Sequence, residues 1–431
     1  MADAPVTEAG IASRLQAAAR LLQEGRAEEA AAACAGILAR DPAHPLALHL
    51  QGLALSRLGR TEDATAALRR AVAAAPERPA SHVALGNALR KGGDNAGARA
   101  AFEAALGLDP GNAAAAFNLA LVEADLGNDA RADALLHRVA RADPLDFDAT
   151  QLLVQRVASR TEGLASEPRE ASPGAPCLEL GRVSVGFCSI DAAREARARA
   201  SLAAALGATP HEIIVIRDAR SLSEALNRIL DQASGDTVIL CHDDIEVISP
   251  RLDHALERAL READIVGVAG SQRVSGPAVL WSGHPHLHGW VTYPRGGALE
   301  AAPLSLRSGV IGGMQALDGV FLAMRATVAR TLRFDDSTFD GFHFYDLDFT
   351  YRAHLAGHRL AVTTEALLLH ASEGRFDAEW NRYAERFRAK FPALAEPSRP
   401  AHWYGARVAS TAHALRFYEA LTTLDAPRNS P

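Results

Sequence analysis

The sequence predicts an α plus α/β protein, in which an N-terminal all-α solenoid precedes an α/β domain with a mostly parallel sheet. Proline and glycine recur at a constant spacing of 34 residues in the first third of the chain. From Arg182 onward, short β-branched runs alternate with helix-like stretches. The expected limits are 1–158 for the solenoid, 159–179 for a linker, 180–396 for the α/β domain and 397–431 for a C-terminal helical extension.

The composition is that of an ordinary soluble globular protein. The 431 residues are 48% hydrophobic and 23% charged, so they can form large cores. A net charge of −7 provides no basic field, and we expect no nucleic-acid partner. The four cysteines are far apart and the N-terminus has no apolar signal segment. No apolar run reaches the ~20 residues of a membrane span, so we expect a cytoplasmic protein without a transmembrane segment.

The first third of the chain is expected to be an array of helix pairs. Each recurring glycine ends a first helix and each recurring proline follows a second one, at Gly25, Gly59, Gly93, Gly127, Pro42, Pro76, Pro110 and Pro144. Apolar residues recur in phase on one face, at Ala30, Ala64, Ala98 and Ala132 and at Cys34, Leu68, Phe102 and Leu136. These residues resemble the tetratricopeptide repeat, over about four units in residues 11–146.

The resemblance to this repeat implies a concave face that holds a peptide or a partner protein. The residues expected on that face are His49, Arg57, Asn87, Arg90, Lys91, Phe117 and Asn118. The alternative is that the face is only a solvated helical surface, and that the array is a spacer or a dimer contact.

Beyond the repeats, the segment from Thr161 to Cys177 is rich in Pro, Gly, Ser and Glu and is expected to be a linker. The runs RVSVGFCSI, HEIIVIRDA and TVILC are predicted strands with helix-like stretches between them. Parallel βαβ units of this kind bind ligands at the carboxyl ends of their strands. The residues at the end of the third run are His242, Asp243 and Asp244.

Three explanations compete for these adjacent carboxylates. Asp243 could cap a nearby helix or turn. An acid/base pair around a scissile bond is disfavoured, because the two acids are neighbours in sequence. A divalent cation explains them best, since Mg²⁺ and Mn²⁺ bind one or two carboxylates and complete their shell with substrate phosphates.

A second group of acids lies between Arg333 and His358 and includes Asp346 and Asp348. Acids in the first turn of a helix favour its dipole, and Asp348 is the better candidate for that structural role. A later apolar run, EALLLHASEG, brings His370 to another strand end, where it is either a core histidine or a functional one.

The C-terminal part resembles a family 2 type bacterial glycosyltransferase-like domain of the GT-A fold. The resemblance covers roughly residues 182–394 and rests on SEALNRILDQASGDTVILCHDDIEV, VGVAGS, ALDGVFLAMRATV and FDGFHFYDLDFTYRAHLAGHRLAV, followed by the strand that ends in His370. It implies that Asp244 and His370 contact a divalent cation, Mn²⁺ or Mg²⁺, on the pyrophosphate of a nucleotide sugar, with a UDP-sugar as the expected donor. It places Asp346 as the base toward the acceptor hydroxyl in an inverting transfer.

The same resemblance implies a set of donor- or acceptor-binding residues, which are Ile190, Asp218, Asn227, His242, Asp243, Asp318, Gly319 and Asp348. Two positions depart from the family pattern. Arg217 stands at the end of the second strand and Asp218 follows it, which leaves the uracil preference open. Tyr345 replaces the first acid of a Glu-Asp pair, so Asp346 must act alone.

The histidines of SGHPHLHGW, at 284, 286 and 288, offer zinc as an alternative ligand, but they lack a fourth partner of known spacing, and an acceptor-side loop is expected instead.

The predicted function is a metal-dependent inverting glycosyltransferase whose acceptor, a protein or a glycan carrier, is recruited by the repeats. One alternative is a non-catalytic scaffold with a degenerate nucleotide-sugar-binding domain, and a nucleotidyltransferase is another. The first strand lacks the glycine-rich phosphate loop of a nucleotidyltransferase. Asp244, Asp346 and His370 together favour an enzyme, because a scaffold needs none of them.

Overall fold

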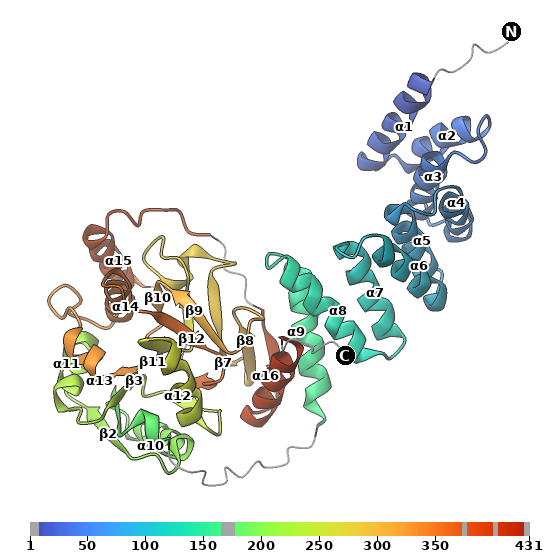
Figure 1. Cartoon of the computed structure of the whole chain (residues 1–431). Helices are drawn as coiled ribbons and strands as arrows, with labels where there is room; N and C mark the ends of the chain where they lie inside the picture. The colour runs from blue at the N-terminus through green and yellow to red at the C-terminus, as the bar shows by residue number, and fades with distance from the viewer. Residues whose placement is uncertain (1–7, 165–176, 373–376, 400–403, 426–431) are drawn as a thin grey trace. The chain divides into compact units, whose positions relative to one another are not determined.

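The structure, a computed structural model, describes residues 8–164, 177–372, 377–399 and 404–425. The chain forms two compact units, Met1–Ala142 and Asp143–Pro431 (Figure 1). The first is all-helical and the second is a mixed α/β unit, which confirms the predicted fold class. Within the described residues, no helix has both the length and the apolar character needed to span a bilayer.

The first unit consists of successive helix pairs. They are α1 (Glu8–Gln23), α2 (Ala27–Leu38), α3 (Pro45–Arg57), α4 (Thr61–Ala74), α5 (Pro79–Lys91), α6 (Asn95–Leu108), α7 (Ala113–Asp125) and α8 (Asp129–Ala142). The four recurring glycines lie in the turns inside these pairs, with φ between 75° and 81°. This left-handed region favours glycine, so the predicted helix ends are confirmed.

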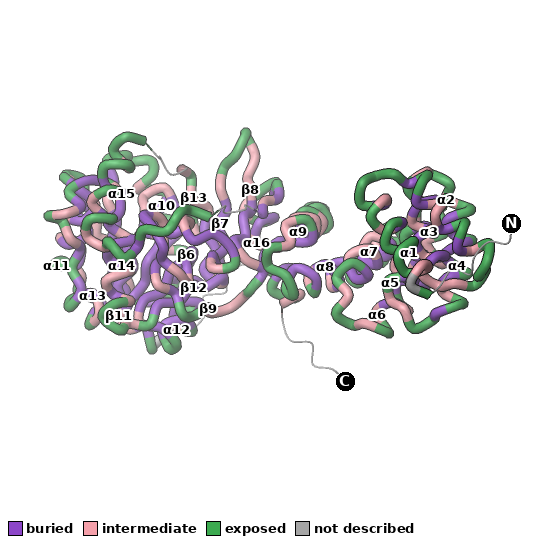
Figure 2. The backbone as a smooth tube through the Cα atoms, turned by 90° about the horizontal axis from the view of Figure 1, so that it is seen from above, coloured by how far each residue is buried: buried purple, intermediate pink, exposed green. Residues whose placement is uncertain are grey.

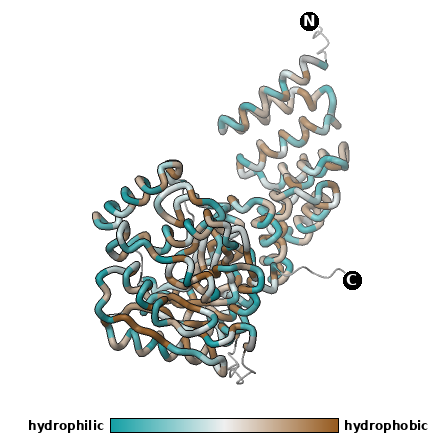
Figure 3. The backbone as a smooth tube through the Cα atoms, turned by 60° about the vertical axis from the view of Figure 1, so that its left-hand side comes forward, coloured by the Kyte–Doolittle hydropathy of each residue, from teal (hydrophilic) through white to brown (hydrophobic). Residues whose placement is uncertain are grey.

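Small residues let the paired helices approach closely. The four alanines that recur every 34 residues are fully buried, and Phe102 is buried beside Gly86. A Cβ atom at Gly86 would come within 2.6 Å of the Phe102 ring, which explains the absence of a side chain there. In Figure 3, hydrophobic and hydrophilic segments alternate along these helices, as amphipathic helices of a solenoid require.

The second unit begins with α9 (Phe147–Glu162), which packs against α16 (Thr411–Asp425) and β14 (Ala406–Val408). The side-chain amide of Gln151 donates to the backbone oxygen of Gly405 at 2.9 Å, and accepts from its nitrogen at 3.3 Å. The division between the units therefore lies before the predicted limit at 158. The predicted linker falls mostly outside the described residues, and its first residues belong to α9.

The main sheet is mixed rather than mostly parallel. Among the described residues the sheet has seven strands, in the order β2 (His211–Ile216), β1 (Val183–Cys188), β3 (Thr237–Cys241), β11 (Phe321–Arg325), β5 (Ile265–Gly267), β12 (Leu360–Thr363) and β9 (Val310–Met314). Strand β1 is parallel to β2 and β3, and β12 is parallel to β5, but β11 runs antiparallel to both of its neighbours.

Helices cover both faces of this sheet. Leu202 of α10 (Ala192–Leu206) and Leu256 of α12 (Leu252–Glu262) pack on one face. Ile229 of α11 (Leu222–Gln232) and Phe349 of α14 (Tyr345–Leu355) pack on the other. The inner strands of the sheet are consequently buried, whereas the edge strands β2 and β9 are partly exposed. Figure 2 shows this buried interior of the second unit. The remaining helices are α13 (Ala326–Thr331) and α15 (Ala378–Lys390), with short 3-10 turns at Leu178–Leu180 and Val279–Ser282.

The second unit contains a second sheet. Its path, over the described residues, is β10 (Ala316–Leu317), β6 (Ala269–Ser271), β7 (Leu287–Arg295), β13 (Leu368–His370) and β4 (Ile245–Val247), with β8 (Ala298–Pro303) joining β7 to β14. The residues between β3 and β4 pass from one sheet to the other. The antiparallel register of β13 and β4 pairs His370 with Ile245, so His370 lies next to the 242–244 segment.

Candidate functional site

The structure brings together two histidines and one aspartate at this crossing. The Nδ1 atom of His242 lies 3.2 Å from Nε2 of His370 and 3.8 Å from Oδ1 of Asp244. The distance from His370 Nε2 to the same Asp244 oxygen is 3.4 Å. All three ligand atoms lie within 4.8 Å of one another, close enough to contact a single cation.

The charge states of this cluster suit a cation. Burial opposes ionisation of Asp244, but hydrogen bonds from His370 and Ser372 and the charges of both histidines outweigh it, so its pKa lies below the ordinary value. Burial, and then the charge of His370, lower the pKa of His242. Metal ligands must be an ionised carboxylate and neutral imidazoles, and the lowered pKa values of Asp244 and His242 favour those states in these two residues.

The cluster opens onto a cavity of about 550 Å³. His242 and His370 line it together with Asp318, Tyr345 and Asp346. Much of the remaining wall is aliphatic or aromatic and comes from Val279, Leu280, Leu304, Phe342 and Trp380. Ligand sites typically combine apolar walls with a few convergent polar groups, so this cavity is the candidate active site.

Asp346 projects into the cavity from the first turn of α14. Its Oδ2 atom accepts a hydrogen bond from the backbone nitrogen of Gly319 at 2.8 Å. Burial, and then the charge of Asp318, raise the pKa of Asp346 to about 6. A carboxylate whose pKa is this close to neutrality is suited to accept a proton from a substrate hydroxyl.

The backbone before Asp346 is held in an uncommon conformation. Phe344 has a φ of 66°, although it is not glycine, and it precedes the first residue of α14. Such a conformation costs free energy and persists only where the surroundings impose it, often at functional sites. Phe344 is buried among Phe339, Phe387 and Trp380, and this packing holds the start of α14 in place.

The sequence did not predict a role for Tyr345. In the structure its side chain is only 6% exposed, and its hydroxyl oxygen lies 2.7 Å from Nε2 of His242. A tyrosine in place of an acid, directly before the predicted base, was the only signal in the sequence.

Three predicted donor contacts lie at the carboxyl ends of β1, β2 and β3. Ile190 is 93% exposed, Asp218 forms an ion pair with Arg228 at 2.8 Å, and Asp243 accepts a hydrogen bond from Ser189 at 2.6 Å. The cavity lining, over the described residues, does not include them. Their role in donor binding stays a prediction.

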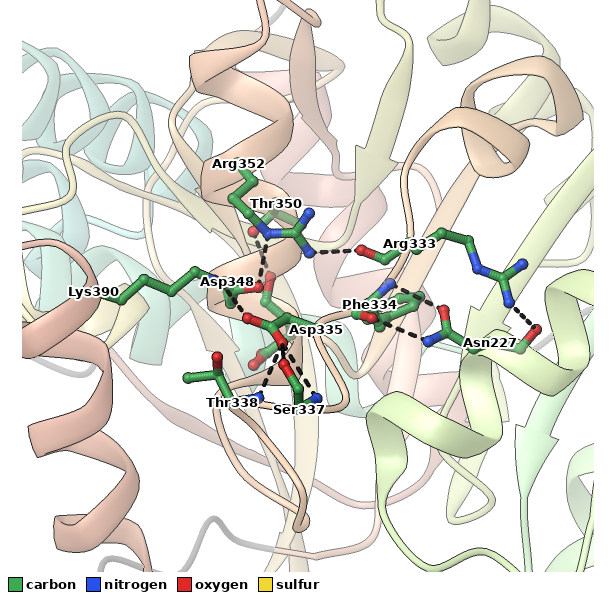
Figure 4. A network of polar contacts seen from close by, with 11 residues as sticks. Asn227, Arg333, Phe334, Asp335, Ser337, Thr338, Asp348, Thr350, Arg352 and Lys390 are labelled. Carbon is green, nitrogen blue, oxygen red and sulfur yellow. Dashed lines mark hydrogen bonds and ion pairs between the residues drawn. The ribbon is translucent and has the colours of Figure 1, made fainter.

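Asn227 and Asp348 are engaged inside the protein (Figure 4). The Asn227 amide donates to the oxygen of Phe334 and accepts from its nitrogen, both at 3.0 Å. Asp348 is fully buried, and its two oxygens form ion pairs with Arg352 at 2.8 Å and with Lys390 at 2.6 Å. This geometry supports the structural role of Asp348. A donor or acceptor contact of either residue stays a prediction.

The histidines of the 284–288 segment do not form a metal cluster. Among the described residues, the other group that could hold an ion consists of Cys177, Asp253 and His254. In that group Asp253 already forms an ion pair with Arg251 at 2.9 Å. His288 is buried, contacts Ser305 at 3.0 Å, and burial lowers its pKa to about 4. The zinc alternative is therefore not supported by the described side chains.

Comparisons with known proteins agree with this architecture. Residues 197–391 match a family described as "Glycosyltransferase like family", and residues 15–79 and 83–147 match the tetratricopeptide repeat family. The chain therefore joins tetratricopeptide repeats to a glycosyltransferase-like family domain. The mixed α/β topology of this glycosyltransferase-like domain is consistent with the GT-A fold. No curated protein matches the chain.

Several solved structures are similar to parts of the chain. MamA of Desulfovibrio magneticus RS-1 is 20% identical over 35% of this chain and 85% of its own, with a TM-score of 0.33. PilF of Pseudomonas aeruginosa is 18% identical over 35% and 69%, with a TM-score of 0.34. A mutant O-GlcNAc transferase of Thermobaculum terrenum is 23% identical over 51% of this chain and 40% of its own, with a TM-score of 0.29. At such TM-scores these likenesses carry no argument for function.

Proposed function

We propose that the glycosyltransferase-like domain is a metal-dependent inverting glycosyltransferase that transfers a sugar from a nucleotide sugar, with a UDP-sugar as the expected donor. The observation that carries this proposal is the shared cavity. A cluster fit for a divalent cation and a carboxylate with a raised pKa line the same 550 Å³ space. An inverting transfer needs charge stabilisation on the leaving-group side and a base on the acceptor side.

His242, Asp244 and His370 would hold the cation. When bound, a divalent cation supplies charge stabilisation for the diphosphate leaving group. Imidazole ligands suit transition metals, whereas carboxylate and water suit Mg²⁺ and Mn²⁺ alike. With two imidazoles and one carboxylate, the donor set fits Mn²⁺ better than Mg²⁺.

Asp346 would take the proton of the acceptor hydroxyl. The backbone N–H of Gly319 orients one of its oxygens, and the side chain lines the cavity in which the acceptor would bind. The cation cluster and Asp346 come from different elements, the β3–β4 crossing and α14. A donor held by the first group and an acceptor held by the second would react in line, with inversion at the anomeric carbon.

The repeats would deliver the acceptor, a protein or a glycan carrier. A binding surface joined to the catalytic unit raises the effective concentration of the acceptor without adding catalytic groups. Two of the cations expected on the concave face are engaged with the preceding repeat: Arg57 donates to the oxygen of Leu22, and Lys91 to that of Ser56, both at 2.9 Å. The remaining residues of that face stay candidates for acceptor contacts.

A thermal-shift titration with UDP-sugars, in the presence of Mn²⁺, Mg²⁺ or EDTA, tests the proposal. A ligand at 100 times its Kd stabilises the folded state by about 2.7 kcal/mol. We expect this shift with Mn²⁺, and we expect Asp244→Asn to abolish it. Asp231→Asn is the matched control, because it removes the same charge from a surface ion pair with Arg333. Donor binding by Asp244→Asn that resists EDTA would refute the site, and donor binding without any turnover would favour the non-catalytic scaffold.

A further inference from the structure

The proposed metal site requires that the hydrogen bond between Tyr345 and His242 has one particular donor. The two nitrogens of the His242 ring face different partners. Its Nδ1 atom faces His370 and Asp244, and its Nε2 atom faces the Tyr345 hydroxyl at 2.7 Å. Only one ring nitrogen of a neutral imidazole carries a proton, so the partner of Nε2 decides which nitrogen has the free lone pair.

A phenol hydroxyl can either donate or accept a hydrogen bond, and the two cases have opposite consequences here. If Tyr345 donates to Nε2, the ring proton of His242 sits on Nδ1 and points into the cluster, where it would keep a cation out. If Tyr345 accepts, the ring proton sits on Nε2 and the lone pair of Nδ1 faces Asp244 and His370. Histidines that bind metals almost always donate their other N–H to such a second partner.

We propose that Tyr345 is a positioning residue for the metal site: its phenol oxygen accepts the Nε2 proton of His242 and so directs the Nδ1 lone pair toward Asp244 and His370. This inference rests on the proposed function, because it assigns a purpose to the tautomer only if a cation binds there. Tyr345 would act on the cation only through its contact with His242.

The surroundings hold Tyr345 in this position. Its ring packs near Phe334, with the ring centroids 6.3 Å apart. A Cβ atom at Gly319 would overlap the Tyr345 hydroxyl oxygen and come within 2.6 Å of Cβ of Asp346. Glycine at 319 is therefore what lets both residues lie against the end of the main sheet. The partner of the metal ligand and the proposed base are thus consecutive residues of one helix turn, and they are positioned together.

The test uses the full-length protein, with two measurements on the wild type and on Tyr345→Phe. The first is ¹⁵N NMR of the imidazole nitrogens without metal, which identifies the protonated nitrogen of His242. The second is Mn²⁺ affinity, measured by electron paramagnetic resonance titration without nucleotide. We expect a proton on Nε2 in the wild type and a mixture of tautomers in Tyr345→Phe, with Mn²⁺ affinity reduced 10- to 100-fold, the range for loss of such a partner.

Tyr383→Phe is the control. Tyr383 is also buried and donates to Asp340 at 2.8 Å, so this variant likewise removes one phenol hydroxyl, but outside the metal cluster. It should leave the His242 tautomer and the Mn²⁺ affinity unchanged, even if it lowers stability.

The outcomes separate this inference from the proposed function. If the wild type binds no Mn²⁺, the metal site fails, and the NMR measurement still decides the hydrogen bond. If the wild type binds Mn²⁺ and Tyr345→Phe binds it equally well, the positioning role is overturned. A proton on Nδ1 in the wild type overturns it too, and that measurement does not depend on whether the variant folds.

Discussion

Replacing Asp346 with asparagine is expected to stabilise the second unit while it removes most of the transfer activity. The carboxylate is half-buried, and burial together with the charge of Asp318 raises its pKa from about 3.8 to about 6. The folded state therefore binds this proton more tightly than the unfolded state. The stability from this group is fully present below the unfolded pKa and is lost as the pH rises through about 6.

The magnitude follows from the shift. Since one pH unit of pKa difference corresponds to 1.36 kcal/mol, ionised Asp346 costs the folded protein at most about 3 kcal/mol at pH 8. The asparagine side chain of the variant would be neutral at every pH and would avoid that cost. By linkage, the gain should fall to about half at pH 5, where the folded carboxyl is already largely protonated. Loss of a general base should lower the transfer rate by a factor on the order of 100 or more, with donor affinity nearly unchanged.

Asp348→Asn is the matched control, two residues along the same helix. Asp348 is fully buried between Arg352 and Lys390, so the substitution removes the charge that faces both cations, and Lys390 keeps its ion pair with Asp335. Removing one member of a buried ion pair costs several kcal/mol, here on the order of 3 kcal/mol because both cations are partly exposed. The same chemical change should therefore stabilise at position 346 and destabilise at position 348.

Urea unfolding followed by tryptophan fluorescence measures both effects. The four tryptophans of the chain are Trp281, Trp290, Trp380 and Trp403, so the signal comes from the second unit alone. Equal or lower stability of Asp346→Asn at pH 8, or a gain that does not shrink at pH 5, would refute the burial argument. Wild-type turnover in Asp346→Asn would refute the assignment of the base.

Two further predictions concern pH and the start of the second unit. Because deprotonated Asp346 is the active form, kcat/KM should rise with pH through about 6. Asp318→Asn removes the neighbouring charge and should therefore move this rise to lower pH. A pH profile that does not move in this variant would exclude Asp346 as the titrating base. A variant starting at Asp143 should have the same urea midpoint as the full chain. A variant starting at residue 175 should unfold at a lower urea concentration, because it lacks the buried Leu153, Val154 and Val157 of α9. Equal midpoints for these two variants would contradict the packing of α9.

The repeats could be predicted because their information is local. A solenoid repeat contacts only its neighbours, so the same small and apolar residues must return at every period. Gly25 and its three counterparts mark turns with positive φ, and Ala30 and its counterparts mark close helix contacts. The sequence of α9 does not show which unit the helix belongs to, because its apolar face could pack on another helix pair as well as on α16 and β14.

The site could be predicted only in part. A strand end is visible in sequence, so the residues after β3 and the end of β13 were candidates, as was Asp346 at a helix start. Whether a polar side chain faces a cavity or an internal partner is decided by distant residues. Asn227 contacts Phe334 and Asp348 contacts Lys390, and the sequence around Asn227 and Asp348 does not predict these partners.

The sequence by itself determined the two kinds of architecture, the repeat period and the residues able to hold a cation or accept a proton. Only the tertiary structure decided which of them meet. The register of β13 on β4 places His370 beside Asp244, and the start of α14 places Tyr345 against His242. Such contacts depend on how two sheets and a helix pack, and packing is a property of the whole core rather than of any local pattern.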